Sequence, residues 1–596
     1  MTDNKNISIN GIPVSVEKGK TILEAAGQAG VIIPTLCYHK DLCVAGNCRV
    51  CVVEVAGQKR LSAACATPCE EGMEIHTNSL NVRNSRKHII ELLLSEHHAD
   101  CTRCYKNGNC ELQKLASDYK IVTQDFISLF PQKKYTIDMF SPAIIKDDSK
   151  CIRCQRCVRT CAEIQGVSAL TVARKGDQMK ISTFFEKPLN DVVCTTCGQC
   201  INHCPTGALI ERNYIEEVWE AIANPKLHVV VQTAPAVRIG LGEEFGLPPG
   251  TRVTGKMVAA LKRLGFDAVL DTDFAADLTI MEEGTELLTR LKKVLVEKDP
   301  SVKLPMATSC SPGWIKYIEH IYPEFLDHLS TCKSPQQMFG ALAKTYYAQA
   351  RQLNPQQIVS VSIMPCTAKK FEADRPEMKA SGFRDIDYVL TTRELSFMIK
   401  QAGIDFQHLE EARFDRLMGE STGAGVIFGA TGGVMEAALR TAYELVTGRE
   451  IPFRNLNVTP VRGMEGVKEF SVTIENPRQE WAFLDGVELK CAIAHGLINA
   501  REVMENIKSG KSSYHFIEIM ACPGGCLGGG GQPLPTNPEI RTKRAEAIYA
   551  EDEEMPVRKS HQNPEIQMIY KEFLGEPLGE KSHQLLHTHY MARKRY

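Results

Sequence analysis

The feature that most constrains this chain is a pair of cysteine runs with the same internal spacing. In each run, two, two and three residues separate four successive cysteines, first from Cys151 to Cys161 and again from Cys194 to Cys204. Spacing of this kind is typical of a segment that holds two [4Fe–4S] clusters, where the fourth cysteine of each run ligates the other cluster. We therefore assign one cluster to Cys151, Cys154, Cys157 and Cys204, and a second to Cys194, Cys197, Cys200 and Cys161.

Composition supports metal ligation rather than disulfide bonding. The chain has 596 residues and 23 cysteines, and it begins without the apolar segment of a signal peptide. It shows no apolar run near the length of a membrane span, so we expect a cytoplasmic protein. Because the cytosol keeps thiols reduced, these cysteines are predicted to bind metal. A net charge of -2 gives no basic field for nucleic acid, and the length favours about four domains.

Alternating apolar and polar residues from position 7 to about 55 predict a small sheet. Four cysteines accompany it with ten, two and thirteen residues between them: Cys37, Cys48, Cys51 and Cys65. This spacing is close to, but wider than, the plant-type ferredoxin pattern, so a [2Fe–2S] cluster is the predicted occupant. A zinc site at the central cysteine pair is the competing interpretation. Cys43 and Cys69 lie near these four as alternative ligands; the resemblance described below implies that they are spectators, because they do not match the ligand positions of that family.

A predicted helix over residues 84–96 leads into a run of one histidine and three cysteines: His97, Cys101, Cys104 and Cys110. Exchanging a thiolate for a neutral imidazole makes a cluster less negative and generally raises its potential. A lone histidine is more often structural than a ligand, so the residues alone leave this role open between a ligand and a structural side chain.

Three segments in the second half of the chain carry further thiols. Cys522 and Cys526 lie in a stretch of fourteen residues of which six are glycine, so the backbone can bend closely around a bound group. Cys366 follows an apolar strand-like run, and Cys310 precedes a Ser-Pro-Gly-Trp sequence. Together these segments resemble the three signature segments of the [FeFe]-hydrogenases, which hold the six-iron H-cluster. The resemblance extends over essentially the whole chain.

The resemblance implies that Cys366, Cys522 and Cys526 ligate the [4Fe–4S] cubane of the H-cluster, and that Cys526 also bridges to a two-iron subsite carrying CO, cyanide and a bridging dithiolate. The family pattern has two adjacent cysteines, a proton relay and then a ligand, whereas here Ser311 follows Cys310. A serine alkoxide suits an iron–sulfur cluster less well than a thiolate. Three alternatives remain: Ser311 ligates, Cys310 ligates and leaves the relay to another group, or the cubane has three protein ligands. We favour the first, because the surrounding register is undisturbed.

The N-terminal segments are similar to the front end of respiratory complex I and of the larger hydrogenases, where the ligating histidine lies four positions before the first cysteine; this selects His97 over His98.

After residue 225 cysteine becomes scarce, and strands such as 229–231 and 358–364 alternate with helical stretches, as in an α/β domain. The predicted fold is multidomain, α+β and α/β. Its parts are a β-grasp [2Fe–2S] domain (1–79), a [4Fe–4S] domain ligated by one histidine and three cysteines (80–120), a two-[4Fe–4S] ferredoxin domain (140–212), an H-cluster domain (226–537) and a small-subunit-like tail (538–596).

A proton path is also implied by the resemblance: Cys310, Glu283, Ser330, Glu286 and Arg290. Spacings of three and four residues place Glu283, Glu286 and Arg290 on one face of a helix, if that segment is helical. The competing interpretation of these acids is a solvated helix face.

A second set of residues is expected around the H-cluster. Lys369 should contact a cyanide ligand, because a buried cation stabilises an anionic diatomic, whereas exposure is a plausible alternative for Lys370. The expected cofactor-lining residues are Ala234, Pro235, Pro335, Gln336, Met364 and Met520. A methionine at such a position is more often ordinary core packing than a cofactor contact.

The implied reaction is the reversible conversion of 2 H⁺ and 2 e⁻ to H₂. One [2Fe–2S] and three [4Fe–4S] accessory clusters are expected to carry the electrons to and from the active site. The expected partners are ferredoxin or flavin-containing NAD(P)-linked subunits, with electron bifurcation as one form of the latter, and maturation proteins that build the two-iron subsite. The glycines at 425–433 lack the spacing of a nucleotide site. An H₂ sensor or cluster-bearing scaffold is the alternative from another class, and a complex I-type electron-transfer module explains only residues 1–212. The presence of both Lys369 and Cys526 favours catalysis.

Overall fold

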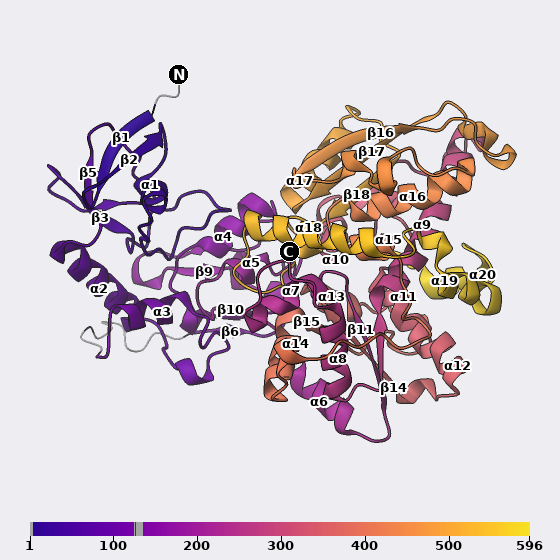
Figure 1. The fold of residues 1–596 in the computed structure, drawn as a ribbon, viewed down its shortest axis with the longest axis horizontal. Helices are drawn as coiled ribbons and strands as arrows, with labels where there is room; N and C mark the ends of the chain where they lie inside the picture. Colours follow the sequence, from indigo (N-terminus) through magenta and orange to yellow (C-terminus); the bar gives the residue numbers. More distant parts are fainter. Residues whose placement is uncertain (1–3, 124–125, 127–134, 596) are drawn as a thin grey trace.

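The computed structural model describes residues 4–123, 126 and 135–595. Small sheets and short helices make up the N-terminal part, and two four-stranded sheets with surrounding helices make up the larger C-terminal part (Figure 1). The prediction of a multidomain fold with α+β and α/β parts is confirmed. Among the described residues, no helix is both long and apolar enough to cross a membrane.

The first sheet is small, as the alternating pattern predicts. Its strands, in lateral order, are β2 (Ile12–Glu17), β1 (Asn4–Ile9), β5 (Glu74–His76), β3 (Val52–Val55) and β4 (Ser62–Ala63). Helix α1 (Ile22–Gln28) covers it and begins with a capping box in which Thr21 and Glu24 satisfy each other's backbone N–H groups. Long cysteine-bearing loops connect these elements, so the thiols are held at the edge of a rigid unit.

Two further small units follow. Helix α2 (Leu80–Ser95) begins four residues before the predicted start, because the Ser79 hydroxyl accepts a hydrogen bond from the Val82 N–H and caps it. Next along the chain is α3 (Glu111–Asp118). The twin cysteine runs flank α4 (Arg156–Arg159) and α5 (Gln199–His203), beside a three-stranded sheet of β10 (Leu209–Glu211), β7 (Ile144–Asp147) and β6 (Ile137–Asp138).

The larger part is built on two sheets. The first is wholly parallel: β12 (Ala268–Asp271), β11 (His228–Thr233), β14 (Ile358–Met364) and β15 (Tyr388–Thr391). The second sheet contains β13 (Met306–Ala307), β18 (Phe516–Met520), β17 (Glu488–His495) and β16 (Val467–Thr473). Ala234, Cys310, Cys366 and Cys522 each follow the carboxyl end of one of these strands within three residues, and carboxyl ends of parallel strands are the usual place for a site.

Helices surround the two sheets and carry the remaining candidate residues. Those nearest the site are α9 (Thr272–Lys292), α10 (Pro312–Ile321), α11 (Pro335–Leu342) and α13 (Ala368–Ala373). The helix α9 follows β12 directly and is buried along most of its length. Because Glu283, Glu286 and Arg290 all lie on α9, the helical spacing predicted for them is present.

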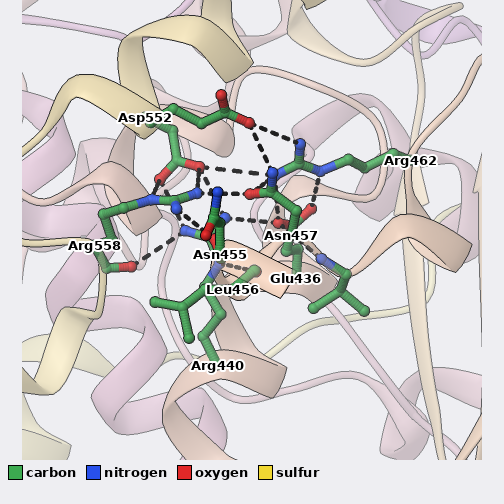
Figure 2. Close-up of polar contacts among 10 residues, drawn as sticks. Glu436, Arg440, Asn455, Leu456, Asn457, Arg462, Asp552 and Arg558 are labelled. Atoms are coloured by element: carbon green, nitrogen blue, oxygen red, sulfur yellow. Dashed lines mark hydrogen bonds and ion pairs between the residues drawn. The ribbon is translucent and has the colours of Figure 1, made fainter. Parts of the chain in front are cut away.

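The C-terminal tail is locked onto the larger part by buried charges. Helix α18 (Pro538–Glu554) packs on α15 (Gly423–Ile427), which in turn packs on α16 (Gly433–Thr447) (Figure 1). Figure 2 shows Arg440 of α16 between Glu436 and Asp552, whose carboxylates accept its hydrogen bonds at 2.6 and 2.8 Å. The guanidinium and both acids are fully buried. Two partly exposed arginines also pair with these acids: Arg462 with Glu436 and Arg558 with Asp552.

We expect the substitution Arg440→Met to loosen the tail, because it leaves two buried carboxylates short of a cation. Breaking a buried pair costs about 3–5 kcal/mol, and Arg462 and Arg558, which stay paired with the two acids, should bring the cost below that range. Hydrogen exchange of the α18 amides measures this as faster opening of that helix. The matched control is Arg252→Met, which removes an exposed pair with Glu554 on the same helix and should cost less than about 1 kcal/mol. Equal effects of the two substitutions would contradict the assigned role of the buried network.

Candidate active site and metal centres

Four thiols of the N-terminal unit lie close together, as the [2Fe–2S] prediction requires. Cys51 Sγ is 3.4 Å from Cys65 Sγ. Hydrogen bonds with Cys48 and Cys65 hold the pKa of Cys37 far below its ordinary value. The two predicted spectators lie elsewhere: Cys43 is exposed and donates to Glu163 Oε1 at 2.7 Å, and Cys69 packs in the apolar core.

His97 is prepared for metal ligation. Its Nδ1 is buried and has no hydrogen-bond partner among the described residues. Burial lowers the pKa of its imidazole to about 4, so the ring is neutral at pH 7. Burial raises the pKa of Cys110, and Cys104 and Cys101 are near enough to raise it further. His98 is exposed, so the structure brings His97 rather than His98 into the protein interior.

The twin cysteine runs exchange their fourth members, as the spacing predicts. One cavity of about 400 Å³ is lined by Cys151, Cys154, Cys157 and Cys204. Cys161 instead lies near the second run: burial raises the pKa of Cys161 to about 11, and the neighbouring Cys194 adds to this rise. Likewise, burial raises the pKa of Cys197 to about 12, with contributions from Cys194 and Cys161. Buried neutral thiols in groups of four suit cluster binding, which releases their protons.

A second thiol-lined cavity lies where strands of both large sheets end. Three loops bring Cys310, Ser311, Cys366, Cys522 and Cys526 to its wall. All six residues that the sequence predicted as cofactor-lining also contact it: Ala234, Pro235, Pro335, Gln336, Met364 and Met520.

The donor set of this cavity fits an iron–sulfur group. Burial raises the pKa of Cys522 and of Cys366, and it raises that of Cys526 to about 12, so all three are neutral thiols until a metal displaces their protons. The Ser311 hydroxyl oxygen accepts a hydrogen bond from the Ala521 N–H at 3.2 Å, immediately beside Cys522. Soft thiolates converging from separate loops are the ligands that iron–sulfur clusters use.

The second ferredoxin-type cysteine group touches this cavity directly. Cys197 contributes to the cavity wall. Its neighbour Gly198 has φ +71°, and a Cβ there would lie 2.4 Å from Thr367 Oγ1 and 3.0 Å from Gly530 Cα. Only glycine permits this approach of the two backbones. The close contact brings the second cysteine group and the central cavity next to each other.

The proposed proton residues form a buried line from the cavity along α9. Ser330 Oγ donates to Glu286 Oε2 at 2.8 Å, and Arg290 Nη2 donates to Glu286 Oε1 at 2.7 Å. The Ser330 side chain and the Ser309 backbone lie near enough to Glu283 to oppose part of the effect of burial on the pKa of its carboxyl. Burial raises the pKa of Glu283 to about 8, and the charge of Glu286 adds to this rise. The alternative of a solvated helix face is wrong, because both acids are buried.

The two adjacent lysines of α13 have different partners. Lys369 lines the cavity and donates to the Cys310 carbonyl oxygen at 3.1 Å and to Glu372 Oε2 at 2.9 Å. The alternative that Lys370 is exposed is wrong: its side chain is fully buried and its Nζ lies 2.9 Å from Glu394 Oε2. The sequence offered no sign of this pairing, because the two residues lie more than twenty positions apart.

Further residues contact the cavity that sequence reasoning missed, among them Thr272, Ala276 and Phe428. Phe428 lies within the glycine-rich stretch 425–433, whose glycines pack closely against neighbouring chain; a Cβ on Gly429 would lie 2.5 Å from Ile548 Cδ1. That glycine pattern was the sequence signal that could have placed Phe428 at the cavity. No sequence signal pointed to Thr272 and Ala276, which lie one turn apart on α9.

Comparisons with known proteins agree with this geometry. Family models match five stretches: iron only hydrogenase large subunit, C-terminal domain (227–530); iron hydrogenase small subunit (538–593); 2Fe-2S iron-sulfur cluster binding domain (3–80); NADH-ubiquinone oxidoreductase-G iron-sulfur binding region (86–125); and NADH-quinone oxidoreductase subunit 3, ferredoxin-like domain (141–210).

Individual relatives match over great length. NADP-reducing hydrogenase subunit HndD of Solidesulfovibrio fructosivorans is 52% identical over 99% of both chains. Iron hydrogenase 1 of Clostridium pasteurianum is 41% identical over 98% of this chain and 100% of that protein. A solved variant of the apo [FeFe]-hydrogenase HydA1 from Chlamydomonas reinhardtii is 45% identical, with a TM-score of 0.57, over 64% of this chain and 99% of its own.

A thiol-lined cavity beside a series of ferredoxin-like units defines an oxidoreductase that exchanges electrons between iron–sulfur centres and a buried active site. The chain belongs to the iron-only hydrogenase family. It is an [FeFe]-hydrogenase with accessory iron–sulfur domains, and its reaction is the oxidation of hydrogen and the reduction of protons.

Proposed function

We propose that the central cavity holds the H-cluster through Cys366, Cys522, Cys526 and Ser311. The convergence of these four side chains on one cavity carries the proposal. When bound, this cluster supplies the metal site at which protons, electrons and H₂ interconvert. Lys369 places its ammonium at the cavity wall, anchored by Glu372, where it would stabilise an anionic ligand of the cluster.

In this proposal, side chains of the protein transfer protons between the central cavity and Arg290. Burial keeps Cys310 a neutral thiol by raising its pKa, with the charge of Glu283 adding to the rise, so its sulfur holds a proton at the cavity wall. Glu283 takes over this proton in the interior, and Ser330 and Glu286 pass it on toward Arg290. Hops of this kind require groups within hydrogen-bond reach or one water apart. The raised pKa of Glu283 suits a group that both gains and loses a proton near neutral pH.

Electrons follow the accessory centres. We assign one [2Fe–2S] cluster to the domain at 1–79, one His-ligated [4Fe–4S] cluster to 80–120 and two [4Fe–4S] clusters to 140–212, ahead of the H-cluster domain at 226–537 and the tail at 538–596. The thiol groupings described above support these assignments. The contact of Cys197 with the central cavity supports an electron step from the last accessory cluster.

The physiological partners in this proposal are flavin-containing NAD(P)-linked subunits; the relative HndD is an NADP-reducing hydrogenase subunit by name, which supports the NAD(P) link. Ferredoxin is a second electron partner, and electron bifurcation would then take place on the flavin of a partner. Separate maturation proteins supply the two-iron subsite.

An assay of the matured chain tests the partner proposal. Alone, it should evolve H₂ from a reduced viologen dye but should not reduce NAD⁺ or NADP⁺ under H₂; adding flavin-bearing subunits from the same source should restore that reduction. Reduction of NAD(P)⁺ by the isolated chain would overturn the assignment of the nucleotide site to another subunit.

A further inference from the structure

The proposed proton path has a chemical difficulty at its outer end. Arg290 holds its protons too tightly to release them near neutral pH, because the pKa of a guanidinium exceeds about 12. It also donates to the Leu329 and Asp327 carbonyl oxygens, which fixes it in place. Arg290 therefore positions Glu286 well but is a poor carrier. A proton on Glu286 needs another acceptor.

The C-terminal tail brings an imidazole to this point. His587 Nδ1 lies 2.8 Å from Thr331 Oγ1, and the Thr331 N–H donates to both oxygens of Glu286 at 3.1 and 3.2 Å. An oxygen of Glu286, Cys332 Sγ and a ring nitrogen of His587 all lie within 4.8 Å of one another. The Thr331 hydroxyl contacts the ring, and one water would connect it to Glu286, within the reach that proton transfer requires.

The other side of the ring is held by an acid. His587 Nε2 lies 3.1 Å from Glu282 Oε2. Burial raises the pKa of Glu282, but hydrogen bonds from His587, Ser582 and Tyr570 outweigh burial and keep it below its ordinary value. Glu282 is therefore an anion that accepts the Nε2–H, which leaves Nδ1 as the free base, the same division of labour that an acid and a histidine show in hydrolase triads.

A route to solvent begins beside the ring. His583, one turn earlier on α20 (Glu580–Leu586), is exposed, and its ring is stacked on that of His587 with centroids 4.7 Å apart and planes 2° from parallel. Backbone pairing fixes the tail here, because the Lys333 N–H donates to the Leu586 carbonyl oxygen and the Thr588 N–H to the Thr331 carbonyl oxygen, both at 2.8 Å.

We propose that His587, oriented by Glu282, accepts protons from Glu286 and releases them to solvent beside His583, so that the C-terminal tail gives the proton path its outlet. Glu286 gives its proton through one water to the Thr331 hydroxyl, which passes its own proton to His587 Nδ1; the imidazolium then gives one ring proton to water on the side of the exposed His583 and returns to neutrality. One proton enters and one leaves, and the steps reverse for H₂ evolution. This inference rests on the proposed function of Glu286.

Substituting His587 tests the outlet. His587→Gln keeps a donor toward Glu282 and an acceptor toward Thr331 but cannot carry a proton, so turnover should fall at least about tenfold. The matched control is His589→Gln, an exposed tail histidine two positions away, which should change nothing. In His587→Ala, added imidazole should restore turnover, since the neighbouring His583 is exposed to solvent. Full activity of His587→Gln, or loss that imidazole leaves uncorrected, overturns the outlet.

A second readout needs no H-cluster. In protein labelled with ¹⁵N-histidine and purified without maturation, the spectrum of His587 should show the Nε2–H tautomer, and Glu282→Gln should abolish this preference. An unchanged tautomer in Glu282→Gln, or an Nδ1–H tautomer in the parent protein, contradicts the orienting role. Full turnover of Glu286→Gln would remove the proposed path itself, whereas loss in Glu286→Gln with full turnover in His587→Gln would remove only the outlet.

Discussion

The substitution Glu283→Gln is expected to lower H₂ turnover by about 10²–10⁴-fold, the range that a lost proton-transfer group commonly costs. The amide keeps the shape of the side chain but cannot take a proton from the Cys310 thiol or return one. The side chain of Glu283 is buried between the cavity and Ser330, so few other groups could replace it. Optical and magnetic spectra of all the clusters should be unchanged, which separates proton transfer from cluster assembly. Turnover within about twofold of the parent would reject Glu283 as a relay.

Stability provides a second test of the same residue, with a definite sign. The pKa of Glu283 is about 8 when folded and near its ordinary value of 4.5 when unfolded. Between these values the folded chain binds the extra proton, so the contribution of Glu283 to stability is present below about pH 4.5 and is lost as the pH rises through 8. Glu283→Gln lacks this loss, so its stability relative to the parent should increase from pH 5 to pH 8. A pH-independent difference would place the pKa of Glu283 outside that window.

The second large effect is expected at Ser311. If its oxygen is the fourth donor to the cubane, Ser311→Ala removes a ligand and should lower H₂ turnover at least about 100-fold, beyond the usual cost of losing a supporting residue of a metal site. The variant should also lose the iron of the cubane, measured by metal analysis after maturation. Ser311→Cys should retain full iron, because a thiolate is the preferred donor.

Two other results would identify the alternatives at this position. Full iron in Ser311→Ala together with iron loss in Cys310→Ala would assign the ligand to Cys310 and leave the relay to another group. Full iron in both variants would indicate a cubane with three protein ligands. Either result contradicts Ser311 as a ligand, although the Ser311 hydroxyl lies beside Cys522 in the structure.

Residues close in sequence were the easiest to place. The two cysteine runs predicted the grouping of Cys204 with Cys151, and of Cys161 with Cys194, because the spacing of ligands to one cluster is fixed by the size of that cluster. The strand at 358–364 was equally visible, since an unbroken apolar run flanked by turns is typical of a buried parallel strand.

Contacts between distant segments could not be predicted in this way. Lys370 is buried because Glu394 pairs with it, and His587 meets Glu282 across some three hundred positions of sequence. No periodicity or motif in either segment specifies such a pair, since the partner is chosen by the packing of the tail and of α14 (Thr392–Gln401) on the rest of the fold. Polar side chains buried by tertiary contacts look in sequence like ordinary surface residues.

The most direct test of the account is an infrared spectrum of the anaerobically matured chain in the region where metal-bound CO and cyanide absorb. The account predicts bands there that shift when H₂ is added and that are missing from Cys526→Ala, whose accessory clusters remain. A spectrum without such bands, from protein with complete accessory clusters and competent maturation, would contradict the central claim that the cavity between the two sheets holds an H-cluster.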